Sequence, residues 1–206
     1  MSRKRQNKSE QAATEIIKLI RHMRLTLEPL EADFEFAAMQ LSIDENSGCK
    51  HQQFWRRTLI RCLLANIEAM LWNMKNIIPK IALVSCVQLT SQELEVVNEK
   101  KLVNANGKIE ARKYFPQFRE NLMKTFSLFG KVHKLPVTLN YSQDFEALCR
   151  TYELRSRLMH PKRPFDPNVS DLEIAEALSA DKWFVREYCQ LMDHCEKAVP
   201  IIVKNQ

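Results

Sequence analysis

Apolar residues recur at helical spacing along most of this chain, and that periodicity most constrains how the chain can fold. Glycine, which breaks helices and supplies tight turns, occurs only three times in 206 residues. Its scarcity disfavours a β-sandwich with many turns and a glycine-rich phosphate loop. The sequence therefore predicts an all-α protein.

The first two predicted helices cover residues 9–32 and 51–78. Proline lacks a backbone N–H and clashes with the preceding turn, so we expect Pro29 to bend or end the first helix and Pro79 to end the second. A polar loop is expected at residues 44–49. The remaining predicted helices cover residues 115–133, 142–160, 170–178 and 181–199.

The second predicted helix has two faces when its residues are placed about 100° apart. One narrow polar stripe holds Arg57, Arg61, Glu68 and Lys75. A broad apolar arc covers most of the remaining surface, which predicts a central place in a bundle with the stripe facing water or a site. The arc is made of Trp55, Leu59, Cys62, Leu63, Ile67, Met70 and Met74.

Local signals predict one hairpin and two capped helix starts. Asn106-Gly107 separates two short alternating runs, which is typical of a tight hairpin turn, so residues 100–113 are predicted to be a small inserted β-hairpin. The capping-box pattern, a hydroxyl residue followed three positions later by glutamate, occurs at Thr90–Glu93 and Ser170–Glu173.

The domain organisation follows from these elements. We expect residues 1–8 to form a flexible basic tail and residues 9–204 to form a single domain with residues 80–113 as an insertion. The net charge of +6 favours an anionic partner such as RNA or a nucleotide. No apolar run reaches the ~20 residues of a membrane span and the start is polar, so no membrane and a cytoplasmic location are expected.

The cysteine pattern argues against a metal site, and the lack of nucleotide-binding motifs argues against a cofactor. No two cysteines form a C-x-x-C pair, and several lie in apolar helical stripes, so we expect free buried thiols. The sequence has no Walker loop, no dinucleotide fingerprint and no G-x-S-x-G elbow. The six cysteines are Cys49, Cys62, Cys86, Cys149, Cys189 and Cys195.

The helix at 142–160 carries the most unusual arrangement. Arg155 falls at the edge of its apolar face, where a guanidinium needs an anion, either an internal carboxylate such as Glu68 or a ligand phosphate. Leu154 and Leu158 lie beyond it and are expected to form an exposed edge for helix packing. The predicted apolar face is Phe145, Leu148, Cys149, Tyr152 and Met159, and the predicted surface ion pairs are Glu146–Arg150 and Glu153–Arg157.

His160 is expected to end this helix, because the residue before Pro161 is biased away from helical geometry. The negative end of the helix dipole favours the protonated imidazole, whereas Lys162 and Arg163 oppose it. The balance could let His160 titrate near neutral pH, where a general acid or base is useful. Alternatively, His160 caps backbone carbonyls at the helix end.

Arg155-Ser156-Arg157-Leu158-Met159-His160 resembles the motif of the HEPN superfamily, in which arginine is followed by four to six residues and then histidine. The segment Phe54–Ala69 is similar to the long early helix of such proteins, and the resemblance covers residues 10–200. It implies an up-and-down helical bundle that forms a symmetric homodimer with the two motifs facing each other.

The resemblance also implies a metal-independent endoribonuclease, often a toxin or an antiviral defence effector. His160 would be the acid or base and Arg155 the phosphate clamp. Ser156 stands where many active members have asparagine, and it can still donate a hydrogen bond. The expected RNA or phosphate contacts are Ser156, Arg157, Lys162 and Arg163, with Glu68 and Arg61 as supporting residues.

Two alternatives remain open on the sequence. The chain could be a non-catalytic bundle that binds RNA or a nucleotide, with binding that falls steeply with salt. It could instead be a protein-interaction module, with a regulatory partner and with Arg155 satisfied by protein carboxylates. Cleavage of RNA without divalent metal, abolished by His160→Ala, would distinguish the nuclease from both.

Overall fold

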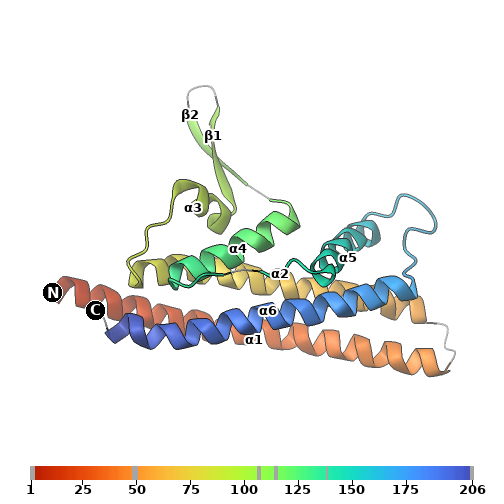
Figure 1. Cartoon of the computed structure of the whole chain (residues 1–206). Coiled ribbons are helices and arrows are strands. Elements are labelled where there is room, and N and C mark those ends of the chain that lie inside the picture. Colours follow the sequence, from red (N-terminus) through yellow and green to blue (C-terminus); the bar gives the residue numbers. More distant parts are fainter. Residues whose placement is uncertain (1–2, 48–50, 106–107, 114–115, 138, 205–206) are drawn as a thin grey trace. The chain divides into compact units, whose positions relative to one another are not determined.

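Figure 1 shows a computed structural model of the chain, which describes residues 3–47, 51–105, 108–113, 116–137 and 139–204. The described residues confirm the predicted all-α bundle with a small β element. The helices are α1 (Arg3–Ser47), α2 (Gln52–Val84), α3 (Ser91–Asn98), α4 (Phe118–Val132), α5 (Gln143–Met159) and α6 (Asp171–Lys204), and the strands are β1 (Lys100–Ala105) and β2 (Lys108–Lys113).

The chain divides into two compact units, each with its own core. One unit contains Met1–Met23, Leu71–Leu139 and Cys189–Gln206, and the other contains Arg24–Met70 and Asn140–Tyr188. The long helices α1, α2 and α6 each contribute a segment to both units. All the predicted site residues belong to the second unit, so its structure decides how they are presented.

The second unit is held together by apolar faces of α1, α2, α5 and α6. Trp183 of α6 packs against Phe145 of α5 with ring centres 5.1 Å apart, and its indole N–H donates to the carbonyl of Asn140 at 2.9 Å. The predicted apolar arc of α2 is largely confirmed. The buried apolar residues of α2 in this unit are Leu59, Ile60, Leu63, Leu64, Ile67 and Met70.

The first unit contains the predicted hairpin and the helices next to it. Strands β1 and β2 pair antiparallel with Lys100 opposite Lys113 and Ala105 opposite Lys108, which confirms the hairpin; its predicted turn at Asn106-Gly107 lies outside the described residues. Helix α3 contacts both β1 and α4 (Figure 1). The predicted capping box is present, because the Glu93 N–H donates to Thr90 Oγ1 at 3.2 Å and the Thr90 N–H donates to Glu93 Oε2 at 2.7 Å.

The helix ends predicted at the prolines are wrong, whereas the bend that was the other expectation at Pro29 stays a prediction. Pro29 lies inside α1 and Pro79 lies inside α2, which continue to Ser47 and Val84. Each proline removes one helical hydrogen bond and costs roughly 3 kcal/mol, but buried apolar residues on both sides of it favour continuation. Around Pro79 these residues are Ile77, Ile78, Ile81 and Ala82.

Three other boundary or exposure predictions are also corrected. Helix α1 begins at Arg3, so most of the expected tail is helical. The expected break between 178 and 181 is absent, because α6 buries Ala177, Ala180 and Trp183 at helical spacing through it. Lys75, assigned to the polar stripe of α2, is buried and pairs with Glu99 at 2.9 Å.

The cysteines are partly as expected. The four whose side chains the structure describes are free thiols, namely Cys62, Cys86, Cys149 and Cys189. Cys62 and Cys149 are half-buried, and Cys86 and Cys189 are exposed rather than buried. Cys49 and the side chain of Cys195 lie outside the described residues. Within the described ranges, no helix combines the length and apolar character needed to cross a membrane.

Candidate functional site

Arg155 of α5 pairs with Glu68 of α2. Its Nη1 lies 3.0 Å from Glu68 Oε1, and its guanidinium carbon lies 5.9 Å from the centre of the Tyr152 ring one turn earlier. The two charged side chains are 31% and 37% exposed, so solvent or a ligand reaches both. Of the two partners expected for Arg155, the free chain supplies the internal carboxylate.

The attraction between Arg155 and Glu68 only partly compensates for the cost of burying the Glu68 charge. Burial raises the pKa of the Glu68 carboxyl above its ordinary value, and the nearby Arg155 lowers it by a smaller amount. The folded chain thus disfavours the charged form of Glu68 despite its cationic neighbour. A phosphate, which stays ionised, can compete with such a carboxylate for Arg155.

His160 ends α5, as predicted. Its backbone N–H donates to the Ser156 carbonyl at 3.1 Å, and its side chain is exposed. Helix α5 is continuous as far as Met159, so Arg155 and His160, five positions apart, project about 140° apart. One molecule therefore does not present the two side chains on a single face.

The other predicted contact residues of α5 face different partners. Arg157 Nη2 donates to the carbonyl of Asn168 and to Glu173 Oε1, each at 2.9 Å. Ser156 Oγ donates to the Tyr152 carbonyl at 3.4 Å and is exposed, and Arg61 is exposed on α2. Arg157 is therefore a link between α5 and the start of α6, which fits a structural role better than the predicted contact with phosphate.

Acidic residues of α6 bind the two arginines of α5 for which surface ion pairs within the helix were predicted. Arg157 binds Glu173, and Arg150 Nε donates to Glu176 Oε1 at 2.9 Å, while the charge of Glu146, four positions earlier, also acts on Arg150. The packing of α5 on α6 brings this second row of carboxylates within reach of both guanidinium groups.

The packed face of α5 differs from the prediction by a rotation of the helix. Leu154 and Leu158 are buried, whereas Met159 is 51% exposed. The expected exposed leucine edge is therefore wrong, because those two side chains pack inside the chain. Arg155 is half-buried, with buried Leu158 on one side of it around the helix and buried Leu148 on the other.

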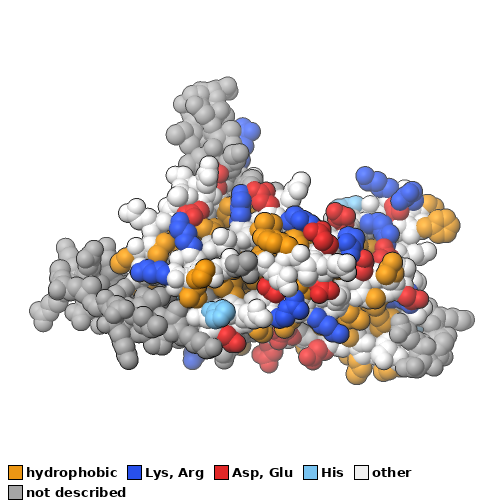
Figure 2. All heavy atoms as spheres, in the orientation of Figure 1, with side chains coloured by type: hydrophobic (Ala, Val, Ile, Leu, Met, Phe, Trp, Pro, Cys, Tyr) orange, Lys and Arg blue, Asp and Glu red, His pale blue; other side chains and the backbone are white. Residues whose placement is uncertain are grey.

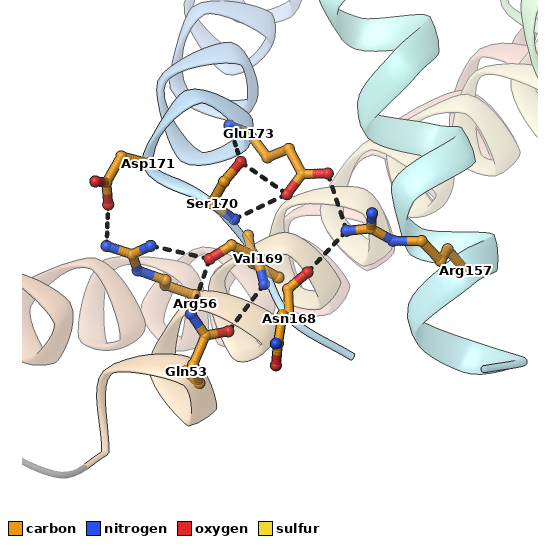
Figure 3. Close-up of a pocket in the computed structure, with 8 residues that line it drawn as sticks. All are labelled: Gln53, Arg56, Arg157, Asn168, Val169, Ser170, Asp171 and Glu173. Atoms are coloured by element: carbon orange, nitrogen blue, oxygen red, sulfur yellow. Dashed lines mark hydrogen bonds and ion pairs between the residues drawn. The ribbon is translucent and has the colours of Figure 1, made fainter. Parts of the chain in front are cut away.

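A polar lock fixes the end of the loop between α5 and α6 (Figure 3). The side-chain amide of Gln53 accepts from the Val169 N–H at 2.8 Å and donates to the Val169 carbonyl at 2.9 Å. Arg56 Nη1 also donates to that carbonyl at 2.9 Å, and its guanidinium pairs with Asp171. These groups line a hollow of about 620 Å³. The arginines of this hollow already pair with carboxylates, and the hydrogen bonds around it hold the loop in place.

Asp166 orders the middle of the same loop. Its buried carboxylate accepts from the N–H groups of Lys162 and Arg163 at 2.8 and 2.9 Å and from Arg163 Nε at 3.1 Å. The backbone hydrogen bond from Lys162, followed by those from Arg163, holds the pKa of Asp166 below its ordinary value. Lys162 and Arg163, both predicted to contact phosphate, remain exposed at their side chains.

Sequence reasoning missed Gln53, Arg56, Asp166 and Phe165. The first two act on residues more than one hundred positions away, and no local pattern reveals such contacts. The sequence does carry a signal for Phe165 and Asp166, because Pro161, Pro164 and Pro167 restrict the backbone of the loop around them. The loop between α5 and α6 is therefore ordered at two points and exposes two cations.

The site contains no candidate metal centre in the described part of the chain, where no three His, Cys, Asp or Glu side chains gather closely enough to hold an ion. Comparison with known protein families, curated proteins and solved structures finds no match. The functional argument therefore depends on the geometry around Arg155, His160 and the loop after them.

Proposed function

We propose that this chain is a metal-independent endoribonuclease of the HEPN type that acts as a homodimer. The observation that carries the proposal is the placement of an exposed His160 at the end of the same helix that holds a partly exposed Arg155. An exposed imidazole can transfer a proton, and an accessible guanidinium can bind a phosphate. The net charge of +6 favours an anionic substrate such as RNA, and we propose that the protein acts in the cytoplasm.

The chemistry needs only these two kinds of group. The ribose 2′-oxygen attacks the adjacent phosphorus and gives its proton to a base, while the bond from phosphorus to the 5′-oxygen breaks and that oxygen takes a proton from an acid. The products are a 2′,3′-cyclic phosphate and a free 5′-hydroxyl. His160 supplies or accepts the proton, and Arg155 stabilises the negative charge that develops on the phosphate oxygens.

A dimer answers two requirements that a single molecule does not meet. Arg155 and His160 project about 140° apart on one helix, and one imidazole is not acid and base in the same step. A second copy related by a two-fold axis would supply a second arginine and a second histidine to the same phosphate. Ser156, Lys162 and Arg163 would then bind the neighbouring phosphates.

One observation favours a second candidate, a bundle that binds RNA or a nucleotide without cutting it. The 3.0 Å ion pair with Glu68 already gives Arg155 an anionic partner in the free chain. A guanidinium held in this way can still exchange its carboxylate for a phosphate, but it is not aimed at a reacting group. This candidate keeps the same RNA-facing surface and dispenses with the role of His160 in proton transfer. In either case a protein partner could regulate access to the surface.

The deciding experiment is cleavage of a labelled mixed RNA pool in EDTA, with wild type, His160→Ala, Arg155→Ala and His194→Ala at equal concentration. His194 is an exposed histidine of α6, outside the site, and serves as the matched control. We expect wild type and His194→Ala to leave 2′,3′-cyclic phosphate ends. His160→Ala should be slower by about 100-fold or more, and Arg155→Ala should also lose activity.

The outcome separates the two candidates. Cleavage by His160→Ala at the wild-type rate would exclude the proposed nuclease. A folded, dimeric wild type that binds RNA in a salt-dependent manner without cutting it would favour the binding protein. RNA affinity that is absent as well would exclude both.

A further inference from the structure

Phe165 is 79% exposed in the loop between α5 and α6. Burying a phenylalanine side chain is worth about 1.5–3 kcal/mol relative to leaving it in water, so exposure of this ring forgoes that stabilisation. The ring also stands outside both cores, since the buried aromatic residues of this unit are Phe145, Trp183 and Phe184. Phe165 is the most exposed large hydrophobic residue in the described part of the chain.

The backbone that carries Phe165 is held in one conformation. The Asp166 N–H donates to the Arg163 carbonyl at 3.1 Å, and the Asn168 N–H donates to the Phe165 carbonyl at 3.0 Å, so Phe165 belongs to two overlapping turns. The Asp166 carboxylate and the polar lock at Val169 fix the loop on both sides of these turns. A ring on such a backbone loses little further conformational entropy when a ligand covers it.

Two exposed cationic side chains lie close to the exposed ring in the sequence. Lys162 and Arg163 precede it, and the Arg163 side chain is 80% exposed although its Nε donates to Asp166. A guanidinium has five N–H donors, so those of the two terminal nitrogens can reach a phosphate. Figure 2 shows Lys and Arg side chains gathered with apolar side chains where this loop rises from the surface.

We propose that Phe165 is a stacking platform for an unpaired base of single-stranded RNA, with Lys162 and Arg163 binding the phosphates beside that base. An exposed aromatic ring next to cations is the arrangement by which proteins bind single strands, because every base has a flat face and every linkage has a charge. This inference depends on the proposed RNA-directed function and names its substrate class. Bases of a duplex are already stacked on one another, so a duplex would not use the ring.

The test measures binding apart from cleavage. The probe is a fluorescent single-stranded RNA whose 2′-hydroxyls are all methylated, so that the proposed reaction does not occur on it. Wild type is compared with Phe165→Trp, which keeps a flat ring, and with Phe165→Leu, which keeps only apolar bulk. Leu172→Ala, at an exposed apolar residue of α6 near the loop, is the matched control, and circular dichroism checks that all variants fold.

We expect Phe165→Leu to weaken binding by roughly tenfold or more, while Phe165→Trp and Leu172→Ala stay within about twofold of wild type. Replacing the bases of the probe with abasic linkers should weaken wild type and leave Phe165→Leu nearly unchanged. A self-complementary duplex of the same length should bind wild type more weakly than the single strand.

Equal affinity of wild type and Phe165→Leu, or of single strand and duplex, would overturn the inference and would favour a protein partner for the ring. Absence of any single-strand binding by wild type would overturn it as well. Failure of the proposed ribonuclease activity can be distinguished from failure of the proposed stacking on Phe165. Ring-dependent binding without cleavage of natural RNA leaves this inference intact, whereas cleavage with ring-independent binding overturns this inference alone.

Discussion

Arg155 Nη1 lies 3.0 Å from Glu68 Oε1, and this ion pair joins α5 to α2 at the border of the core. Both side chains are about one-third exposed, so the pair resembles a surface ion pair, which is worth about 0–1 kcal/mol. Burial nevertheless raises the pKa of Glu68. The pair is therefore weak enough for a phosphate to displace the carboxylate without loss of the fold.

We predict that Glu68→Gln increases affinity for the methylated single-stranded RNA by about three- to tenfold at low salt, because it removes the anion that competes for Arg155. Fluorescence anisotropy at several salt concentrations measures the effect. Glu176→Gln is the control, since it removes the same charge from the partner of Arg150 instead. An equal gain in both variants would mean that only the total charge matters.

The raised pKa of Glu68 gives this competition a pH dependence. A carboxyl whose pKa is raised on folding contributes stability below its ordinary pKa of 4.5, and that contribution is lost as pH rises through the raised value. Protonation also releases Arg155. The ratio of affinities between Glu68→Gln and wild type should therefore shrink as pH falls toward 4.5, and a ratio that stays constant with pH would contradict this account.

Leu154 and Leu158 test whether the apolar edge of α5 belongs to the core or to a partner interface. Both are buried, so Leu154→Ala and Leu158→Ala should each lower the free energy of unfolding by about 2–4 kcal/mol. Met159→Ala removes similar apolar bulk from an exposed position and should change it by less than about 0.5 kcal/mol. Urea unfolding measures all three. Wild-type stability of both leucine variants would instead indicate that Leu154 and Leu158 belong to a partner interface.

Much of the local structure could be predicted from the sequence, because its causes are local. The strand pairing at 100–113 was predicted from sequence signals within the hairpin itself, and the capping boxes depend on side chains three positions apart. The end of α5 at His160 follows from the proline after it. In each case the energy that decides the structure comes from neighbours in the chain.

The errors share a different cause. A proline inside a helix is disfavoured locally, but packing on either side of Pro29 and Pro79 outweighs that cost, and packing depends on residues far along the chain. The partner of Arg155 was predicted only as one of two alternatives, because a helical wheel gives the edge position without the opposing helix. The lock between Gln53 and Val169 spans 116 positions and had no local signal.

His133 gives the first unit a separate sensitivity to acid. Its ring is buried beside Phe129, its Nδ1 lies 2.8 Å from the Phe129 carbonyl, and burial lowers its pKa below the ordinary 6.5. A lowered pKa means that the unfolded chain binds the proton more readily, so stability is full above 6.5 and is lost as pH falls through the folded value.

We therefore expect wild type to lose stability progressively as pH falls from about 7 to 5, while His133→Gln is less stable at pH 8 but changes less across this range. Urea unfolding at each pH, monitored by circular dichroism, provides the measurement. His194→Gln at an exposed position should follow wild type. A His133→Gln curve parallel to wild type would assign the acid sensitivity to other groups.

The Asp166 carboxylate holds the loop that carries the proposed RNA surface, so the stability of this loop should depend on pH. Its hydrogen bonds from Lys162 and Arg163 lower its pKa below the ordinary 3.8, so its contribution to stability is present above 3.8 and is lost as pH falls through the lowered value. Asp166→Asn removes the charge that accepts all three donors. At pH 7 we expect this variant to be less stable than wild type, and the difference should narrow as pH falls below 3.8.

The same variant should weaken binding of single-stranded RNA, because a looser loop no longer holds the Phe165 ring and the two cations in place. Asp193→Asn, at an exposed position of α6, removes one negative charge without touching the loop and should bind at least as well as wild type. Opposite effects of the two variants on affinity would separate loop order from net charge. Tighter binding by Asp166→Asn would mean that its carboxylate repels RNA more than it organises the surface.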